Sequence, residues 1–345
     1  MNTTNRKIIN AIIEKAENLC PDSLALIGVY GSVATGDDYA KSDLDLLVLI
    51  QNEEGRKLGT GFILNDSAVG YDLYCTDWNS LHHEAQCHQA HISKLMDSDV
   101  VYVKNQEAYD RLCKLREETK SFLESDKRFQ RVDDLTIKAK AAYADSLLCD
   151  GLGQVRLNAF KVIDCLLNAV MLYHGKYFRL GVKRTFDEMS KLPVEDAFLD
   201  NMKKIAASKG ISEIRELLKG LLLYADEYMH REKPKEEPSS ALTGTYEELY
   251  SNWRNKVEAA SADNDVFSSF VNMCCFQYML SDISSEFDVG DYNVMEEYNP
   301  EKLSDNVLIY DKYLQEYEKA CNKAGIKIKR FSDVDAFVAE YLGKR

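Results

Sequence analysis

The stretch GVYGS at residues 28–32, followed after ten residues by DLDLLV at residues 43–48, decides how the first part of this 345-residue chain is interpreted. Residues 24–30 form a short apolar run that predicts a strand, and the glycine and serine that follow break it. Residues 44–50 are apolar nearly throughout, which predicts a second strand in the interior of a sheet. The alternative, a hairpin turn followed by a solvent-facing edge strand, fits this apolar run less well.

Two carboxylates and a Gly-Ser turn carry the chemistry of this stretch. Asp43 and Asp45 are two residues apart on the predicted strand, so they face the same side, with Cα atoms about 6.6 Å apart. Carboxylates at that separation can hold divalent cations jointly. The backbone N–H groups after Gly31 and the Ser32 hydroxyl suit phosphate oxygens, and Gly31 lets the backbone approach a ligand closely.

A third acid, Asp72, lies in GYDLY at residues 70–74, within a predicted strand over 69–75. If this strand neighbours the second, their backbones are about 4.8 Å apart, and Asp72 completes a cluster of three carboxylates. Such a cluster is what metal-assisted phosphoryl or nucleotidyl transfer requires, because the acids hold Mg²⁺ and Mg²⁺ neutralises phosphate charge. Asp77 is a weaker competitor, since it is better placed to cap the helix that follows.

The pattern Gly31-Ser32, ten residues, Asp43-x-Asp45 and then the strand acid Asp72 resembles the DNA polymerase β-type nucleotidyltransferase superfamily. A small first domain followed by a helical one is similar to the bacterial antibiotic nucleotidyltransferases of the aminoglycoside and lincosamide types. Residues 157–191 and 252–256 look like the helical domains of uncharacterised members, and they do not fix a substrate.

This resemblance implies a role for each residue of the motif. Asp43 and Asp45 would ligate Mg²⁺, with two ions expected, and Ser32 with the Gly31 backbone would hold the β- and γ-phosphates of ATP or another nucleoside triphosphate. Asp72 would ligate the second ion or act as general base. A hydroxyl of a small acceptor would then attack the α-phosphorus and pyrophosphate would leave. If the acceptor is an aminoglycoside-like antibiotic, the activity would confer antibiotic resistance.

The rest of the chain predicts two domains. Residues 1–125 read as an α+β nucleotidyltransferase domain, a mixed sheet flanked by helices, with one of the helices over residues 78–96. Residues 126–345 carry almost no strand signal and predict an all-α bundle that closes over the substrates. Within it, residues 232–245 contain two prolines and are the clearest linker.

Basic residues of the helical domain are candidates to close the triphosphate site. Lys183 is the favoured one, because it pairs with a second charge, Arg184, after the turn at Gly181; Lys161 and Lys176 are weaker candidates. For each, a solvated surface charge is the simpler interpretation.

A group of histidines with a cysteine, and an acidic segment, each have a functional interpretation and an ordinary structural one. His83, Cys87 and His91 are four residues apart on the predicted helix, close to His82 and His88, but three ligands over about 12 Å of helix cannot all reach one metal ion. The acidic residues 286–305 form either a solvated loop or part of a cleft for a cationic acceptor.

Composition restricts the partners. The net charge is −14, from 43 Lys and Arg against 57 Asp and Glu, which argues against nucleic-acid binding but not against a metal-bound triphosphate. No apolar run reaches the about 18 residues of a membrane helix, and no signal peptide is evident. Nine scattered cysteines without a CxxC pair fit a reducing compartment. We therefore expect a cytoplasmic protein without nucleic-acid or membrane partners.

Other functions remain open from the sequence. One is an inactive, or antitoxin-like, nucleotide-binding module that pairs with a helical ribonuclease. No Arg precedes His174 or His230 at the offset of four to six residues that is typical of such ribonucleases. Another is transfer of AMP to a protein side chain. A homodimer is expected only by analogy with relatives.

Overall fold

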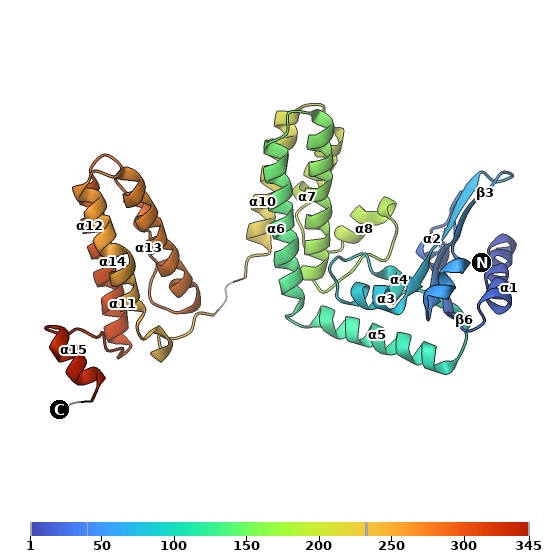
Figure 1. The fold of residues 1–345 in the computed structure, drawn as a ribbon. Helices are drawn as coiled ribbons and strands as arrows, with labels where there is room; N and C mark the ends of the chain where they lie inside the picture. Colours follow the sequence, from blue (N-terminus) through green and yellow to red (C-terminus); the bar gives the residue numbers. More distant parts are fainter. Residues whose placement is uncertain (1, 40, 232–233, 344–345) are drawn as a thin grey trace. The chain divides into compact units, whose positions relative to one another are not determined.

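The computed structural model describes residues 2–39, 41–231 and 234–343 of the chain (Figure 1). These form two compact units, Met1–His230 and Arg231–Arg345, and each is described by itself. The border falls at the start of the linker predicted over 232–245, of which residues 232–233 lie outside the described residues. None of the described helices combines the length and apolar composition that a membrane span needs.

A mixed four-stranded sheet forms the first part of unit 1, as predicted. Its order is β5-β2-β1-β6, in which β1 (Leu24–Tyr30) is antiparallel to β2 (Asp45–Ile50) and to β6 (Asp99–Val103), while β5 (Cys75–Asp77) is parallel to β2. The apolar runs therefore form the two central strands, because both of their faces are covered. The register pairs Tyr30, the last residue of β1, with Asp45, the first of β2.

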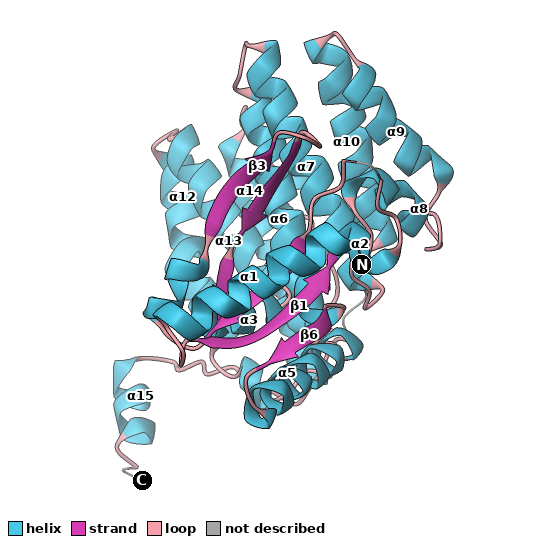
Figure 2. Cartoon of the chain, turned by 90° about the vertical axis from the view of Figure 1, so that its right-hand side faces the viewer, coloured by secondary structure: helices cyan, strands magenta, loops and turns pink. Residues whose placement is uncertain are grey.

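Helices cover both faces of this sheet. Alternate residues of β2, such as Leu46 and Val48, pack with α1 (Thr3–Leu19), which lies across the strands in Figure 2. Leu47 and Leu49 point to the other face and pack with α3 (Trp78–Ala85) and α5 (Gln106–Glu124). Asp45 alternates with Leu46, so it lies on the face of α3 and α5.

Two elements differ from the predictions. The strand predicted over 69–75 is divided: β4 (Val69–Leu73) pairs with β3 (Thr60–Leu64) in a separate two-stranded sheet, and only β5 joins β2. The helix predicted over 78–96 is also divided, into α3 and α4 (Ser93–Met96).

The second division has a tertiary cause. Between the two helices, the buried Ala90 accepts a hydrogen bond at its carbonyl from the N–H of Phe178, and its own N–H donates to Asn168 Oδ1 at 2.6 Å. Cys87 adopts a left-handed φ of 52°. Backbone groups that a continuous helix would use internally are thus satisfied by a distant part of the chain.

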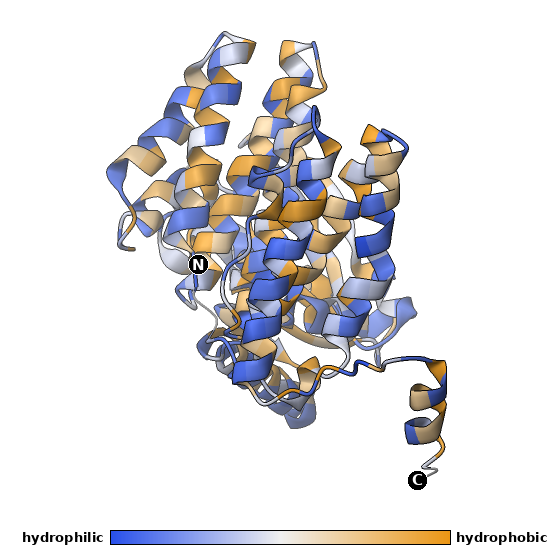
Figure 3. Ribbon diagram, turned by 90° about the vertical axis from the view of Figure 1, so that its left-hand side faces the viewer, coloured by the Kyte–Doolittle hydropathy of each residue, from blue (hydrophilic) through white to orange (hydrophobic). Residues whose placement is uncertain are grey.

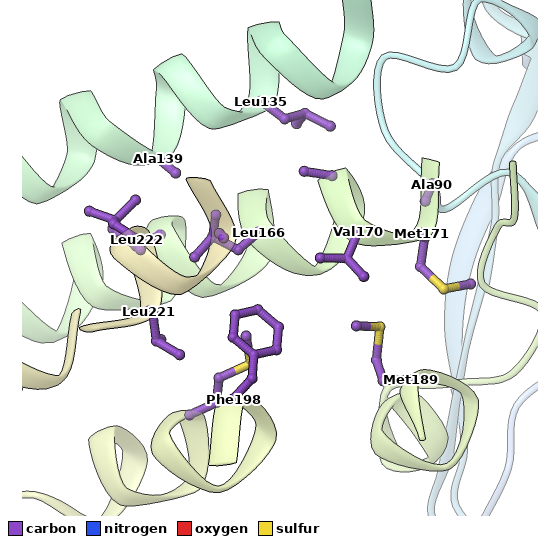
Figure 4. Close-up of a cluster of buried hydrophobic side chains, with 14 of the residues drawn as sticks. Ala90, Leu135, Ala139, Leu166, Val170, Met171, Met189, Phe198, Leu221 and Leu222 are labelled. Atoms are coloured by element: carbon purple, nitrogen blue, oxygen red, sulfur yellow. The ribbon is translucent and has the colours of Figure 1, made fainter. Parts of the chain in front are cut away.

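The helical part of unit 1 consists of α6 (Arg128–Leu147), α7 (Leu152–Tyr173), α8 (Thr185–Met189), α9 (Asp196–Ala207) and α10 (Ile211–Tyr228). These helices share one core, in which Figure 4 shows Leu166 and Val170 of α7 near Phe198 of α9 and Leu221 of α10. Cys87, Ala90 and Ile92 belong to the same core. The expected boundary at 125/126 therefore does not separate compact units: α6 to α10 pack with the first part of the chain and only residues after 230 separate.

Unit 2 is helical, with the short 3₁₀ turns Ser240–Leu242 (η3) and Val294–Glu296 (η5) and a π-helical turn at Tyr250–Arg254 (η4). Its helices are α11 (Thr245–Leu249), α12 (Asn255–Ala262), α13 (Val266–Glu286), α14 (Leu303–Lys323) and α15 (Val334–Tyr341). Hydrophobic and hydrophilic residues alternate along the helices in Figure 3, and the apolar side chains of α13 and α14, among them Phe276 and Tyr310, meet in a core of its own.

Replacing Asn168 tests the link through Ala90. Asn168→Ala leaves the N–H of Ala90 buried without a partner, so we expect the free energy of unfolding to fall by about 1–3 kcal/mol. Urea denaturation followed by circular dichroism measures this, with Gln154→Ala on the exposed face of α7 as the control. Equal stability of the two variants would contradict the structural role of this contact.

Candidate active site

The two predicted acids lie where β2 begins. Asp45 is the first residue of the strand and is half-buried, while Asp43 precedes the strand and is exposed. Repulsion between them is visible in the pKa of Asp45, which burial, and after it the charge of Asp43, raise to about 6. The pair therefore forms a negatively charged site that a cation would stabilise.

Gly31 is required by the position of Asp45. It has a left-handed φ of 68°, and a Cβ atom added to it would lie 2.0 Å from Oδ2 of Asp45. Any other residue would therefore displace the carboxylate as well as strain the backbone. Ser32 follows as the second residue of α2 (Gly31–Thr35), which ends at a left-handed Gly36. The structure brings Gly31, Ser32, Asp43 and Asp45 of the motif together.

Tyr30 lies close enough to the two acids to be affected by their charge. Burial raises the pKa of its phenol to about 12, and the charges of Asp45, Glu84 and Asp43 add to the effect in that order. Glu84, at the end of α3, pairs with Lys94 at 2.5 Å, and its second oxygen is buried without a hydrogen-bond partner among the described residues. Nothing in the sequence points to this carboxylate, because only the fold places α3 beside the end of β1.

Asp72 is not joined to the two other acids in a metal-binding cluster. It lies on β4, beside a hollow that Arg56, Thr60 and Tyr74 also line. Among the described residues, no three His, Cys, Asp or Glu side chains are grouped so that they could hold a metal ion. Its role therefore stays a prediction.

β4 nevertheless lies close to β2, because side chains of the two strands share a core. The parallel pairing with β2 is made by β5 alone, at residues 75–77, and does not extend to Asp72. Tyr71 and Leu73 share the core of Leu46, so Asp72 alternates to the other side, as Asp45 does.

A cavity of about 560 Å³ adjoins the motif, because Tyr30 and Gly31 form part of its wall. This volume is typical of small-molecule sites. The wall opposite comes from the helical part of unit 1, and three basic residues line the cavity: Arg116, Arg179 and Lys191. The acidic Asp97, Asp99 and Glu188 line it as well.

The three basic side chains differ in the hydrogen bonds and ion pairs that they make with the rest of the protein. Arg116 donates to the carbonyls of Leu95 and Ser98 at 2.8 and 2.7 Å, so it holds the loop between them. The exposed Arg179 makes long contacts with Asp97, at 3.3 and 3.4 Å. The side chain of Lys191 has no hydrogen-bond or ion-pair partner among the described residues.

Glu188 fixes the backbone from which Arg179 extends. Its buried carboxylate accepts hydrogen bonds from the N–H groups of Arg179 and Leu180, both at 3.0 Å. The guanidinium of Arg179 is therefore free to move while its backbone is held.

The basic residues predicted from the sequence lie elsewhere. Lys183 is exposed in the 3₁₀ turn η2 (Val182–Arg184) and does not line the cavity. Arg184 pairs with Asp187 and, at 2.7 Å, with Asp37 in the loop after α2. Lys161 and Lys176 are exposed and outside the cavity. Sequence reasoning missed Arg179 and Lys191, since nothing but the fold separates them from surface cations.

The other residues that the sequence suggested for a functional site make ordinary structural contacts. Asp77 caps α3 by accepting from the N–H of Ser80 at 2.7 Å, as predicted. The rings of His83 and His88 lie 4.7 Å apart and are tilted by 30°, and His91 stacks on Phe178. Of the acidic segment 286–305, Asp291 and Glu297 pair with Lys235 and Lys312 in unit 2.

Comparison with known proteins adds little to this geometry. No family model and no curated protein matches the sequence. Among solved structures, the chain is similar to a nucleotidyltransferase-like protein from Exiguobacterium sibiricum 255-15, at 14% identity and a TM-score of 0.36, over 66% of this chain and 78% of the other. A TM-score this low does not establish a shared fold, so the function proposed below rests on the site residues.

The raised pKa of Asp45 predicts a gain in stability when its charge is removed. Because the folded-state pKa of about 6 exceeds the unfolded value near 3.9, ionisation of Asp45 disfavours folding, fully above pH 6 and not at all below pH 4. After allowance for solvent screening, we expect Asp45→Asn to raise the free energy of unfolding by roughly 1–2 kcal/mol at pH 8.

Urea denaturation in EDTA at pH 8 and pH 4 measures this effect. The difference from the wild type should vanish at pH 4, and Asp43→Asn, which removes only the smaller cause, should stabilise less. An Asp45→Asn protein no more stable than the wild type at pH 8 would contradict the electrostatic conflict between the two acids.

Proposed function

We propose that this protein is a Mg²⁺-dependent nucleotidyltransferase, which moves a nucleoside monophosphate, expected to be AMP from ATP, to a hydroxyl of a small acceptor. The observation that carries the proposal is the packing of the Asp45 carboxylate on the backbone of Gly31, close to Asp43. Gly31 also lines a cavity of nucleotide size, although the two carboxylates are not part of its lining. A carboxylate pair next to a Gly-Ser turn suits a metal-bound triphosphate.

The donor chemistry of Asp43 and Asp45 fits Mg²⁺. Both supply carboxylate oxygens, the ligands that this ion prefers, and the raised pKa of Asp45 indicates uncompensated negative charge. When bound, one or two ions would neutralise charge on the triphosphate and on the departing pyrophosphate. Asp72, on β4, is proposed either as a further ligand or as the general base.

The cavity is the proposed site of the nucleotide. Gly31, followed in the chain by Ser32, would face its phosphates from one wall, and Arg179 and Lys191 from the other. Lys191 has no partner to lose on binding, and Arg179 can exchange its long contacts with Asp97 for a phosphate. We therefore propose these two residues in place of Lys183.

Transfer then needs only positioning and one proton acceptor. The acceptor hydroxyl attacks the α-phosphorus in line, the bond to the bridging oxygen breaks, and pyrophosphate leaves. The hydroxyl proton passes to a carboxylate, for which Asp72 is the proposed acceptor. An aminoglycoside-like antibiotic suits the acidic chain, and a lincosamide is the alternative.

The acids are tested by replacing them. We expect Asp43→Ala and Asp45→Ala each to lower Mg²⁺-dependent transfer about 100- to 1,000-fold without unfolding the chain, because charge stabilisation of this kind contributes on the order of 3–4 kcal/mol. Mass spectrometry of a panel of hydroxyl-bearing acceptors after incubation with Mg-ATP detects the adduct, with Asp66→Ala at the exposed β3–β4 turn as the control.

The same samples distinguish the competing functions. Stabilisation of the fold by a nucleotide in thermal unfolding, without any adduct, would favour an inactive or antitoxin-like binding module. An adduct on a protein side chain would favour protein modification. Retained transfer by the folded Asp43→Ala/Asp45→Ala double variant would exclude the proposed metal site.

Lysine variants test the choice of phosphate-binding residues. Lys191→Ala should raise the KM for the nucleotide about tenfold, the effect of losing roughly 1.4 kcal/mol of binding. Lys183→Ala, which removes an equal charge only eight residues away, should leave KM within twofold. Steady-state kinetics decides between them, and the reverse order of effects would restore Lys183 as the phosphate ligand.

A further inference from the structure

Helix α13 of unit 2 is apolar on two opposite faces. One face, which includes Met273, Phe276 and Leu280, is buried in the core of the unit. On the other side, Phe267 is 76% exposed and Tyr278 72%, with Val271 between them at 38%. A helix that is apolar all round is normally covered all round, so this exposed stripe needs an occupant.

The stripe lies on a segment without charge. Between Asp265 and Asp282, the 16 residues 266–281 include no Asp, Glu, Lys or Arg, although 29% of the chain is charged and four or five would be expected in that length. One edge of the stripe is also held in place. The ring of Phe270 packs edge-on against Tyr298 at 5.7 Å, and the Tyr298 hydroxyl donates to the carbonyl of Val266 at 3.2 Å.

We propose that the occupant is the same stripe of a second copy of this chain, so that two α13 helices pack antiparallel about a twofold axis. Each copy carries a net charge of −14, so two copies repel one another except where charge is absent. An uncharged face on an acidic protein therefore suits a second copy, whereas a different partner would more naturally use the acidic surface and bring basic residues to it.

The spacing of the stripe is complementary to itself. In an antiparallel pair centred between Asn272 and Met273, Phe267 faces the second copy's Tyr278, and Val271 faces the second copy's Cys274. Both pairs are then made twice, as a twofold interface requires. Aromatic rings against each other, and a β-branched side chain against a small thiol, interdigitate without a charged group being buried, provided that the Tyr278 hydroxyl at the end of its ring stays in contact with water.

The area is sufficient for a small dimer interface. At the exposures given above, the rings of Phe267, Phe270 and Tyr278 could bury on the order of 400 Å² per copy. With the valines and the flanking turns, the total over two copies approaches the about 1,000 Å² of a specific interface. We expect a dissociation constant in the micromolar range.

Sedimentation equilibrium on the full chain tests the proposal. The wild type should pass from the 39.3 kDa monomer to a dimer as its concentration rises, and more readily at high salt, because salt screens the repulsion. Phe267→Lys should weaken the dimer at least tenfold. Leu308→Lys, on α14 and 67% exposed, adds the same charge to the same unit and should change the constant less than twofold.

A second variant tests the antiparallel register. In Phe267→Lys/Tyr278→Glu, each lysine faces a glutamate of the other copy, so the dimer should recover at least threefold relative to Phe267→Lys alone. Circular dichroism verifies that each variant is folded. A wild type that stays monomeric at 100 μM would overturn the proposal, as would a Phe267→Lys protein that dimerises normally. A double variant weaker than the single one would overturn the register. These results do not depend on catalysis and leave the proposed function untouched.

Discussion

The approach of the Asp45 carboxylate to the backbone of Gly31 is the constraint on which the site depends. It joins the end of β1 to the start of β2, and no side chain fits between them because a Cβ atom at Gly31 would occupy the position of the carboxylate. The contact places a negative charge on the face that α3 and α5 cover, where burial makes it costly. The two central strands, whose apolar residues pack on both faces, supply the stability that holds this unfavourable arrangement.

The central strands and the acids on them could be predicted because their signals are local. Residues 24–30 and 44–50 are largely apolar runs bounded by turn residues; the first forms β1, and the second forms β2, which begins one residue later than predicted. The division between β4 and β5 could not be predicted, because residues 69–75 carry one continuous strand pattern and nothing in it indicates that the two strands have different partners. The break between α3 and α4 depends on Asn168 and Phe178, which lie far along the chain.

The candidate site likewise contains residues that the sequence predicts and residues that it does not. Gly31, Ser32, Asp43 and Asp45 belong to one motif and come together as their spacing implies. Arg179 and Lys191 look like many other surface cations in the sequence, and their position depends on how α8 and the segment before it pack. The neighbouring charge of Arg184 favours Lys183 as a phosphate ligand in the sequence, but in the structure Arg184 forms an ion pair with Asp37. Local sequence therefore predicts residues on the sheet well and residues supplied by the helical wall poorly.

The tie at Ala90 has a consequence for the wall of the cavity. Asn168 and Phe178 hold Ala90 from the helical side, and the core around it includes Met189, the neighbour of the cavity residue Glu188. Local opening at Ala90 therefore disturbs the core that supports this wall, and the shape of the cavity depends on a contact that none of its lining residues makes.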